Sequence, residues 1–162
     1  MNTKIVFLIF FSLNVLFSCK SNQQIDDGIG YTEYINTQEL DKSVVDKFPN
    51  GQERAVLYTE KNSIRAFPVK EVHYYENGKV QIEGTLKNKR RHGIWTFYHD
   101  NGKVWSTGEF RMGKSIGVFK IYNKEGQIKI KSYYKNNKKI KEDYFINGKL
   151  SKSVDLDKHK IN

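Results

Sequence analysis

The spacing of glycines in the second half of the chain limits what it can fold into. Four of them recur at nearly regular intervals: Gly78, Gly102, Gly126 and Gly148. The first three lie 24 residues apart, the fourth follows after 22, and a tyrosine stands four residues before each. The surrounding sequence follows the same pattern, because residues 117–126 repeat the glycines, the tyrosine and the aromatic or β-branched character of residues 93–102. A period of this length is typical of a repeat protein in which each unit is one supersecondary element.

Each repeat has the pattern of a β-hairpin. A strand rich in aromatic and β-branched residues leads to a turn ending in glycine, which accepts the positive φ of a tight hairpin. The returning strand alternates, with Ile82 and Leu86 on one face and Gln81 and Glu83 on the other. We therefore predict an all-β fold, a single antiparallel meander sheet of repeated hairpins over residues 45–154, in which the four glycines have a structural role. Its packed side is predicted to include Trp95, Phe97, Phe119 and Ile121.

One residue differs in kind from its equivalents in the other repeats. Trp105 aligns with Gln81 and Lys129, on the side of the strand predicted to face solvent. Exposed tryptophans often anchor protein interfaces, although single exposed apolar residues are also common on surfaces without function. We predict Trp105 as a binding residue, with Lys103 and Tyr98 as its neighbours.

The first 18 residues have the features of an export signal. After Lys4, residues 5–17 are almost entirely apolar, and these 13 residues are too few to span a bilayer, which needs about 20. The segment closes with Leu16-Phe17-Ser18-Cys19, which resembles a bacterial lipobox and contains the only cysteine of the chain. We predict lipid attachment at Cys19 and anchoring in the cell envelope, at the outer membrane, facing the periplasm or the exterior. The alternative is an ordinary signal peptide with an incidental cysteine.

The segments around the repeats complete the predicted domain organisation. Residues 1–18 are the signal peptide, residues 19–44 the lipidated cysteine with a polar tether and a short helix, residues 45–154 the repeat domain, and residues 155–162 a charged tail. The helix is predicted over Thr37 to Phe48, because Leu40, Val44 and Phe48 are spaced by four residues. Phe48 to Gly51 resembles a degenerate copy of the later turns.

The positive charge is concentrated in the repeats. The chain has a formal net charge of +10, of which residues 72–120 contribute +5 from nine basic and four acidic residues, and residues 121–162 contribute +6 from eleven and five. Such a field attracts anionic partners, but an exported chain leaves the cytoplasm, so we predict no nucleic-acid partner. Solvated lysines on strand faces would give the same charge without any partner.

No set of residues indicates catalysis. The four histidines do not recur at equivalent places in the repeats and lack metal-ligand spacing; they are His73, His92, His99 and His159. The carboxylates do not recur either, since Glu83 aligns with Thr107 and Lys131. We therefore predict no enzyme activity, no catalytic residue, no metal and no cofactor.

Three stretches of the repeats have a recognisable pattern: Tyr74-Tyr-Glu-Asn-Gly-Lys, His92-Gly-Ile-Trp-Thr-Phe-Tyr-His-Asp-Asn-Gly-Lys and Gly117-Val-Phe-Lys-Ile-Tyr. They resemble the bacterial variant of the MORN repeat, and the resemblance covers about residues 72–150. The third copy departs from it, with Ser132 where the first two have Gly84 and Gly108. Proteins of this kind are often similar to YwqK-type antitoxins, and MORN repeats elsewhere are implicated in protein scaffolding and phospholipid contact.

The resemblance and the charge lead to three functional hypotheses. The leading one is a non-catalytic lipoprotein of the cell envelope whose sheet binds a protein partner. An alternative is an antitoxin or immunity protein that neutralises a toxin domain. A further alternative is electrostatic binding of lipid headgroups or envelope polysaccharide by the lysine-rich face. That binding would weaken with salt and survive replacement of Trp105, whereas an interface centred on Trp105 would do the reverse.

Overall fold

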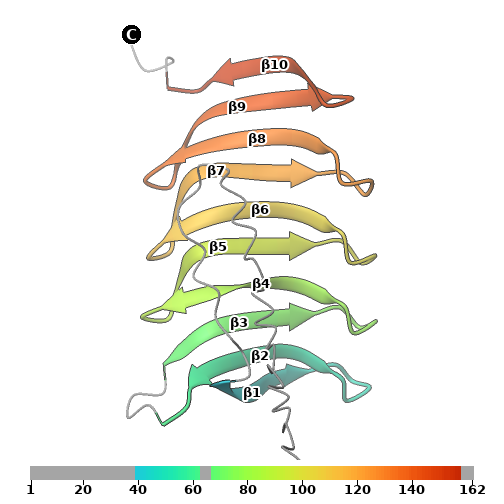
Figure 1. Cartoon of the computed structure of the whole chain (residues 1–162), viewed down its shortest axis with the longest axis vertical. Helices are drawn as coiled ribbons and strands as arrows, with labels where there is room; N and C mark the ends of the chain where they lie inside the picture. Colours follow the sequence, from blue (N-terminus) through green and yellow to red (C-terminus); the bar gives the residue numbers. More distant parts are fainter. Residues whose placement is uncertain (1–38, 63–66, 158–162) are drawn as a thin grey trace, which may run out of the picture.

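The computed structural model describes residues 39–62 and 67–157. Within them, ten antiparallel strands follow one another in a single sheet, each bonded only to its neighbours in the chain (Figure 1). The strands are β1 Leu40–Lys47, β2 Glu53–Glu60, β3 Pro68–Tyr74, β4 Val80–Lys87, β5 Arg90–Tyr98, β6 Val104–Arg111, β7 Lys114–Tyr122, β8 Ile128–Lys135, β9 Lys138–Ile146 and β10 Lys149–Asp155. The predicted all-β meander is confirmed. None of the described segments is a helix long and apolar enough to cross a bilayer.

The helix predicted over residues 37–48 is wrong for its described part, because residues 40–47 form strand β1. β1 pairs antiparallel with β2, with Leu40 opposite Glu60 and Val44 opposite Val56. A spacing of four residues suits one face of a helix, but four is also a multiple of two and therefore suits one face of a strand. The neighbouring strand β2 decides between the two, since it pairs with β1 along most of its length. Thr37, the predicted N-cap, lies outside the described residues.

The turns that contain Gly78, Gly102 and Gly126 share one geometry. In the β5–β6 turn, the His99 amide donates to the Lys103 carbonyl at 2.8 Å and the Gly102 amide donates to the His99 carbonyl at 2.9 Å. Gly102 has φ +88°, so this is a three-residue loop that requires a left-handed residue at its end. The same two bonds close the turns at residues 48–52, 75–79 and 123–127. The turn at Phe48–Gly51 is therefore a copy of the later ones, as predicted.

The opposite margin of the sheet is formed by shorter turns that the glycine spacing does not reveal (left side of Figure 1). They have two residues, both with positive φ, and are Asn88-Lys89, Met112-Gly113 and Asn136-Asn137. Positive φ at both residues defines the type I′ hairpin, which matches the natural twist of paired strands.

The last hairpin departs from the repeat because its turn has the wrong length. β9 and β10 are joined by Asn147-Gly148, with φ +50° and +73°, where the other turns on this side have three residues. The shorter turn accounts for one of the two residues missing from the spacing before Gly148. The other is lost in the β8–β9 hairpin, where Ser132 pairs with the residue ten positions later, whereas Gly84 pairs with the residue eleven positions later. β9 ends at Ile146 and β7 ends at Tyr122, so Tyr144 is not the structural equivalent of Tyr122 despite its equal distance from the glycine.

Aromatic rings packed on glycines form the centre of one face of the sheet. Trp95 is fully buried and lies opposite Gly84, where a Cβ atom would come within 2.3 Å of its ring. Phe119 covers Gly108 in the same way, at 2.1 Å from the Cβ position. The guanidinium of Arg91 lies 4.1 Å from the Trp95 ring centroid. Each ring thus takes the space that a side chain on the paired strand would otherwise occupy.

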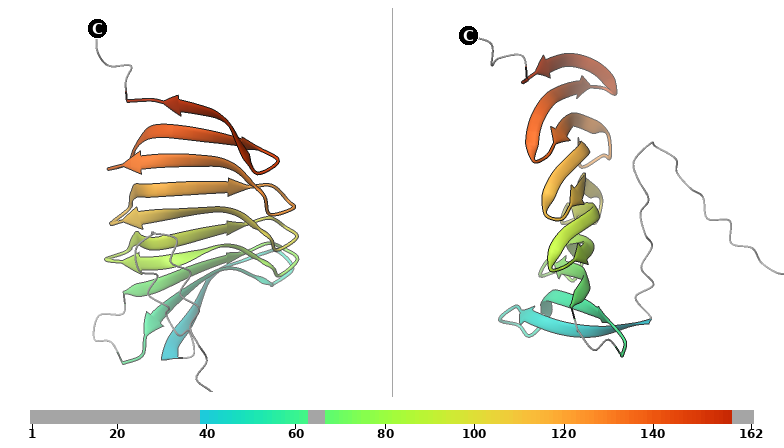
Figure 2. Two further views of the ribbon diagram at one scale, coloured as in Figure 1. Left: turned by 45° about the horizontal axis from the view of Figure 1, so that its top comes forward. Right: turned by 90° about the vertical axis from the view of Figure 1, so that its left-hand side faces the viewer.

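The rings also contact one another from hairpin to hairpin. Phe110 lies 6.4 Å from Trp95 and 5.3 Å from Phe119, and Tyr134 lies 4.7 Å from Phe119, all between ring centroids. The two described contacts of Phe110 are edge-to-face, the arrangement that aromatic pairs favour. Figure 2 shows the hairpins as curved ribbons stacked along one axis. The ring contacts join β5, β6, β7 and β8 in turn, so they form a row through successive repeats. Trp95 is confirmed as core, whereas Phe97, Phe119 and Ile121 are half-buried.

In the third repeat this aromatic row gives way to polar residues. Gly93 and Gly117 have positive φ in β5 and β7, but the equivalent residue in β9 is Lys141, which does not. Ser132 consequently lies opposite Glu142 and not opposite Asp143, the sequence equivalent of Trp95. This shift by one residue places Glu142 on the aromatic face and Asp143 on the other face.

Candidate binding surface

Trp105 lies at a β-bulge that recurs in three hairpins. In the β5–β6 pair, Phe97 is opposite Ser106 and Tyr98 is opposite Val104, so Trp105 is the residue without a partner. The pairing of β3 with β4 skips Gln81 and that of β7 with β8 skips Lys129 in the same manner. Bulges redirect side chains, and all three of these residues are exposed.

The indole ring of Trp105 is partly exposed and also contacts two neighbouring rings. Its side chain is 47% exposed, and its centroid lies 6.2 Å from that of Phe97 with the planes nearly perpendicular, at 88°. The imidazole of His99 lies 6.4 Å away on a second side, tilted by 51°. These contacts limit the rotamers of Trp105 while leaving half of its surface free for a partner.

Lys103, one of the two predicted neighbours, lies two residues before Trp105 in the chain. Lys103 closes the preceding turn, since its carbonyl accepts the His99 amide and its own amide donates to Asn101 Oδ1 at 2.9 Å. Its side chain is exposed beside the start of β6. Lys103 and Trp105 are thus both exposed at the same end of this hairpin.

Tyr98, the other predicted neighbour, points to the opposite face because it follows Phe97 directly in β5. Its hydroxyl donates to Glu83 at 2.7 Å, and Lys70 forms an ion pair with the same carboxylate at 2.9 Å. Burial raises the pKa of Glu83, but the hydrogen bonds from Lys70 and Tyr98 outweigh it and lower the pKa. Burial and the bond to Glu83 raise the pKa of Tyr98. Lys70, Glu83 and Tyr98 thus link β3, β4 and β5. At neutral pH the carboxylate is charged and the tyrosine hydroxyl is neutral, which suits a structural role.

His99 is the residue of this surface that the sequence did not single out. Its Nε2 atom is buried and has no hydrogen-bond partner among the described residues. In the preceding repeat the equivalent residue is Tyr75, whose hydroxyl donates to the Tyr98 carbonyl at 2.7 Å. The imidazole is too short to repeat that bond. The repeat alignment places His99 at the position of Tyr75, and this change of residue type is the sequence signal that could have drawn attention to His99.

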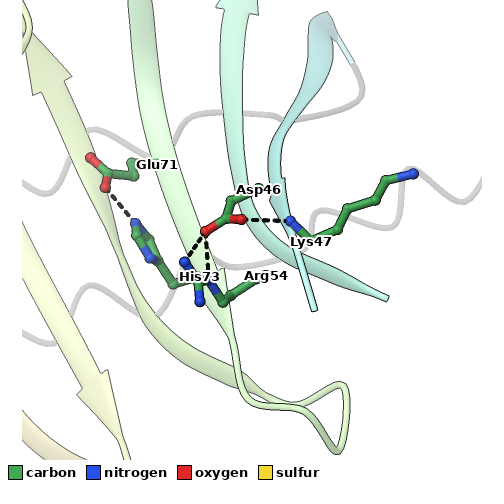
Figure 3. Close-up of polar contacts among 5 residues, drawn as sticks. All are labelled: Asp46, Lys47, Arg54, Glu71 and His73. Carbon is green, nitrogen blue, oxygen red and sulfur yellow. Dashed lines mark hydrogen bonds and ion pairs between the residues drawn. The ribbon is translucent and has the colours of Figure 1, made fainter. Parts of the chain in front are cut away.

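Two polar groups lie at the start of the sheet, and the one that contains Asp46 connects β1 to β2 (Figure 3). Arg54 of β2 pairs with Asp46 of β1, whose other oxygen accepts the Lys47 amide at 2.8 Å. In β3, the His73 ring lies 2.5 Å from the Glu71 carboxylate. Across the described part of the chain, no group of three or more His, Cys, Asp or Glu residues is placed to hold a metal ion.

Glu142 is the centre of a polar group near the other end of the sheet. It accepts hydrogen bonds from Ser132, Lys139 and Tyr144, each at 2.7 Å. Burial raises the pKa of Glu142, but these three bonds outweigh it and lower the pKa to about 2. The carboxylate is therefore charged at neutral pH and joins β8 to β9 where the aromatic row has ended.

The comparisons with known proteins identify the repeats. Three consecutive segments match the MORN repeat variant family, at residues 69–88, 91–112 and 116–136. These matches begin in β3 and end just after β8, so they cover the hairpins with the most regular register. No curated protein sequence matches this chain.

Several solved structures match part of this chain at low sequence identity. The Glycosylation Associate Protein (Gap123) complex from Streptococcus agalactiae is 12% identical with a TM-score of 0.44, over 70% of this chain and 20% of that chain. S. aureus TarM is 11% identical with a TM-score of 0.37, over 76% and 21% of the two chains. This chain thus corresponds to about a fifth of the length of either protein.

Proposed function

Since residues 69–136 contain three consecutive repeats of the MORN repeat variant, we propose that the chain is a non-catalytic binding module that recognises a protein partner at the cell envelope. The observation behind this proposal is Trp105. A tryptophan that is 47% exposed stands where the adjacent repeats have a glutamine and a lysine. Tryptophan is among the residues that contribute most to binding energy when a partner covers them.

The surroundings of Trp105 favour binding for a second reason. Phe97 and His99 already restrict the indole, so little rotamer freedom is left to lose when a partner binds. Lys103 lies at the rim of the same surface and gives it a positive charge. A partner with an apolar recess bordered by acidic residues would fit this surface.

The experiment that tests this function is proximity crosslinking in intact cells, followed by mass spectrometry of the captured proteins. The variant is Trp105→Gln, because Gln81 occupies the equivalent bulge and shows that glutamine is compatible with the fold. The control is Leu150→Gln, which removes a similarly exposed apolar side chain, 58% exposed, from β10. We expect one dominant protein partner that Trp105→Gln loses and Leu150→Gln retains.

The identity of the captured partner separates the hypotheses. A toxin domain as the dominant partner would make the antitoxin or immunity interpretation the leading one. Recovery of only abundant envelope proteins, unchanged between the two variants, would contradict a protein interface at Trp105. Binding that disappears with added salt but survives Trp105→Gln would favour the lipid or polysaccharide alternative.

The proposed location rests on Cys19, which lies outside the described residues. Growth with an alkyne-bearing fatty acid should label the wild-type chain and leave Cys19→Ala unlabelled. Fractionation of two-membrane cells should then place the labelled chain with the outer membrane. No labelling of either form would mean that the leader is an ordinary signal peptide, and equal labelling of both forms would mean that the fatty acid is attached at another residue; either result would contradict lipid attachment at Cys19.

A further inference from the structure

A column of basic residues follows the margin of the sheet that has the two-residue turns. In three successive hairpins, the residues that flank the turn are both basic and lie directly opposite each other: Lys87 and Arg90, Arg111 and Lys114, Lys135 and Lys138. All six are exposed. We call these six residues the basic ladder. Like charges directly opposite each other destabilise paired strands, so strand pairing alone does not account for the arrangement.

Carboxylates leave most of the basic ladder uncompensated. Of its six members, only Lys138 has a carboxylate partner within the described ranges, namely Asp157. Five basic residues elsewhere in the described sheet do form ion pairs with carboxylates, namely Lys42, Arg54, Lys70, Lys139 and Lys141. The charge of the basic ladder is therefore available to an anionic ligand.

Backbone hydrogen bonds hold the turns of the basic ladder in line. The Gly113 amide donates to the Arg91 carbonyl of the preceding hairpin at 2.8 Å, and the Asn137 amide donates to the Ser115 carbonyl at 2.8 Å. The Ser115 amide donates to the side chain of Asn137 at 3.2 Å. Adjacent strands are about 4.8 Å apart, so the basic pairs recur about every 10 Å along the stack.

We propose that the basic ladder binds an extended anionic polysaccharide, laid along the stack with one anionic group at each basic pair. The step between pairs is comparable with the length of an extended disaccharide, so a polymer with a sulfate, phosphate or carboxylate in each disaccharide would match it. Duplex DNA carries a charge about every 1.7 Å and would leave most of its phosphates without a contact. Membrane binding gains from buried apolar area, and Met112 is the one large apolar residue in these three turns.

This site is independent of the function proposed above, because Trp105 belongs to the opposite margin of the sheet. Loss of a protein partner in Trp105→Gln would leave polysaccharide binding unchanged, and the reverse also holds. The two proposals can therefore fail separately.

Binding of the purified full chain to heparin-derived oligosaccharides of increasing length tests the proposal. Affinity should rise until the oligosaccharide spans the three basic pairs, about 20 Å from first to last, and then level off. Neutral dextran fragments of the same lengths should not bind. Absence of heparin binding, or an affinity that does not change beyond a disaccharide, would overturn the proposal.

Paired variants separate the basic ladder from general electrostatic attraction. Arg111→Gln with Lys114→Gln removes the middle pair, while Lys149→Gln with Lys152→Gln removes the same charge from exposed positions of β10. The first variant should weaken binding about tenfold or more and flatten the dependence on salt, and the second should change affinity less than about twofold. Equal losses in the two variants would refute a specific site.

Two competitors decide the class of ligand. Duplex DNA and vesicles containing an anionic phospholipid are added at equal charge concentration to the heparin complex. Poor competition by both would support a polysaccharide site. Stronger displacement by either one would overturn the assignment in favour of nucleic acid or of a membrane surface.

Discussion

At the scale of single residues, the paired glycines and rings have the strictest requirements. Gly84 lies under Trp95, and the Cβ of an alanine there would come within 2.3 Å of the ring. Gly84→Ala should therefore destabilise the fold by about 1–3 kcal/mol, as overpacking does in other cores. The free energy of unfolding in urea measures the loss. Combining it with Trp95→Leu should cost less than the sum of the two single changes, because the smaller side chain removes the clash.

A second prediction at this scale concerns Glu142. Because its folded-state pKa is about 2 and its ordinary value is 4.5, its stabilising contribution is complete above about pH 4.5 and is lost as the pH falls towards 2. Unfolding free energies measured across this range should fall with pH. Glu142→Gln should reduce the slope in this range. An unchanged slope would show that other carboxylates dominate the acid transition.

The burial and orientation of single side chains could be predicted in part from the sequence. The burial of Trp95 followed from the alternation of its strand, and the exposure of Trp105 followed from its mismatch with Gln81 and Lys129. The orientation of Tyr98 could also have been deduced from alternation, which places it on the face opposite Phe97. The proximity of His99 to Trp105 depends on a bulge, and bulges leave no fixed sequence signal.

At the scale of elements, the two-residue turns contain a mismatch between residue and conformation. Met112 has φ +51°, whereas the next turn has Asn136 with φ +48° at the equivalent position. Left-handed backbone costs most residues about 1 kcal/mol and asparagine less. Met112→Asn should therefore raise the stability by about 0.5–1 kcal/mol, with a higher urea midpoint. The reciprocal change, Asn136→Met, should lower the stability by a similar amount. A shift of the urea midpoint in the same direction in both variants would contradict this explanation.

Hairpins were predictable from the glycine-containing turns, but the boundary of the first element was not. The spacing of Leu40, Val44 and Phe48 fits a helix and a strand equally well, and only the pairing with β2 decides. The register of β9 was also hidden, because it depends on whether Lys141 repeats the positive φ of Gly93 and Gly117. In both cases the structure depends on pairing with a neighbouring strand, which the local sequence does not reveal.

At the scale of the whole molecule, the sheet is a linear stack in which each hairpin contacts only its neighbours. Such arrays tolerate loss of an internal unit if the new neighbours fit. Deletion of residues 103–126 removes one 24-residue period and joins Gly102 to Gln127, which preserves the turn. We expect a folded eight-stranded protein with a smaller dependence of unfolding free energy on urea, because less surface becomes exposed. A chain without β-sheet signal in circular dichroism would contradict this expectation.

The order of the strands also determines how the molecule would respond to tension. β1 and β10 lie at opposite ends of the stack, and the strands run across the line that joins them. A pull between these ends would load the backbone hydrogen bonds one after another, so strands would peel off singly at low force. Each 24-residue hairpin would release about 80 Å of extended chain. The sheet would then act as an extensible spacer that gives way in steps before any covalent attachment at its ends is strained.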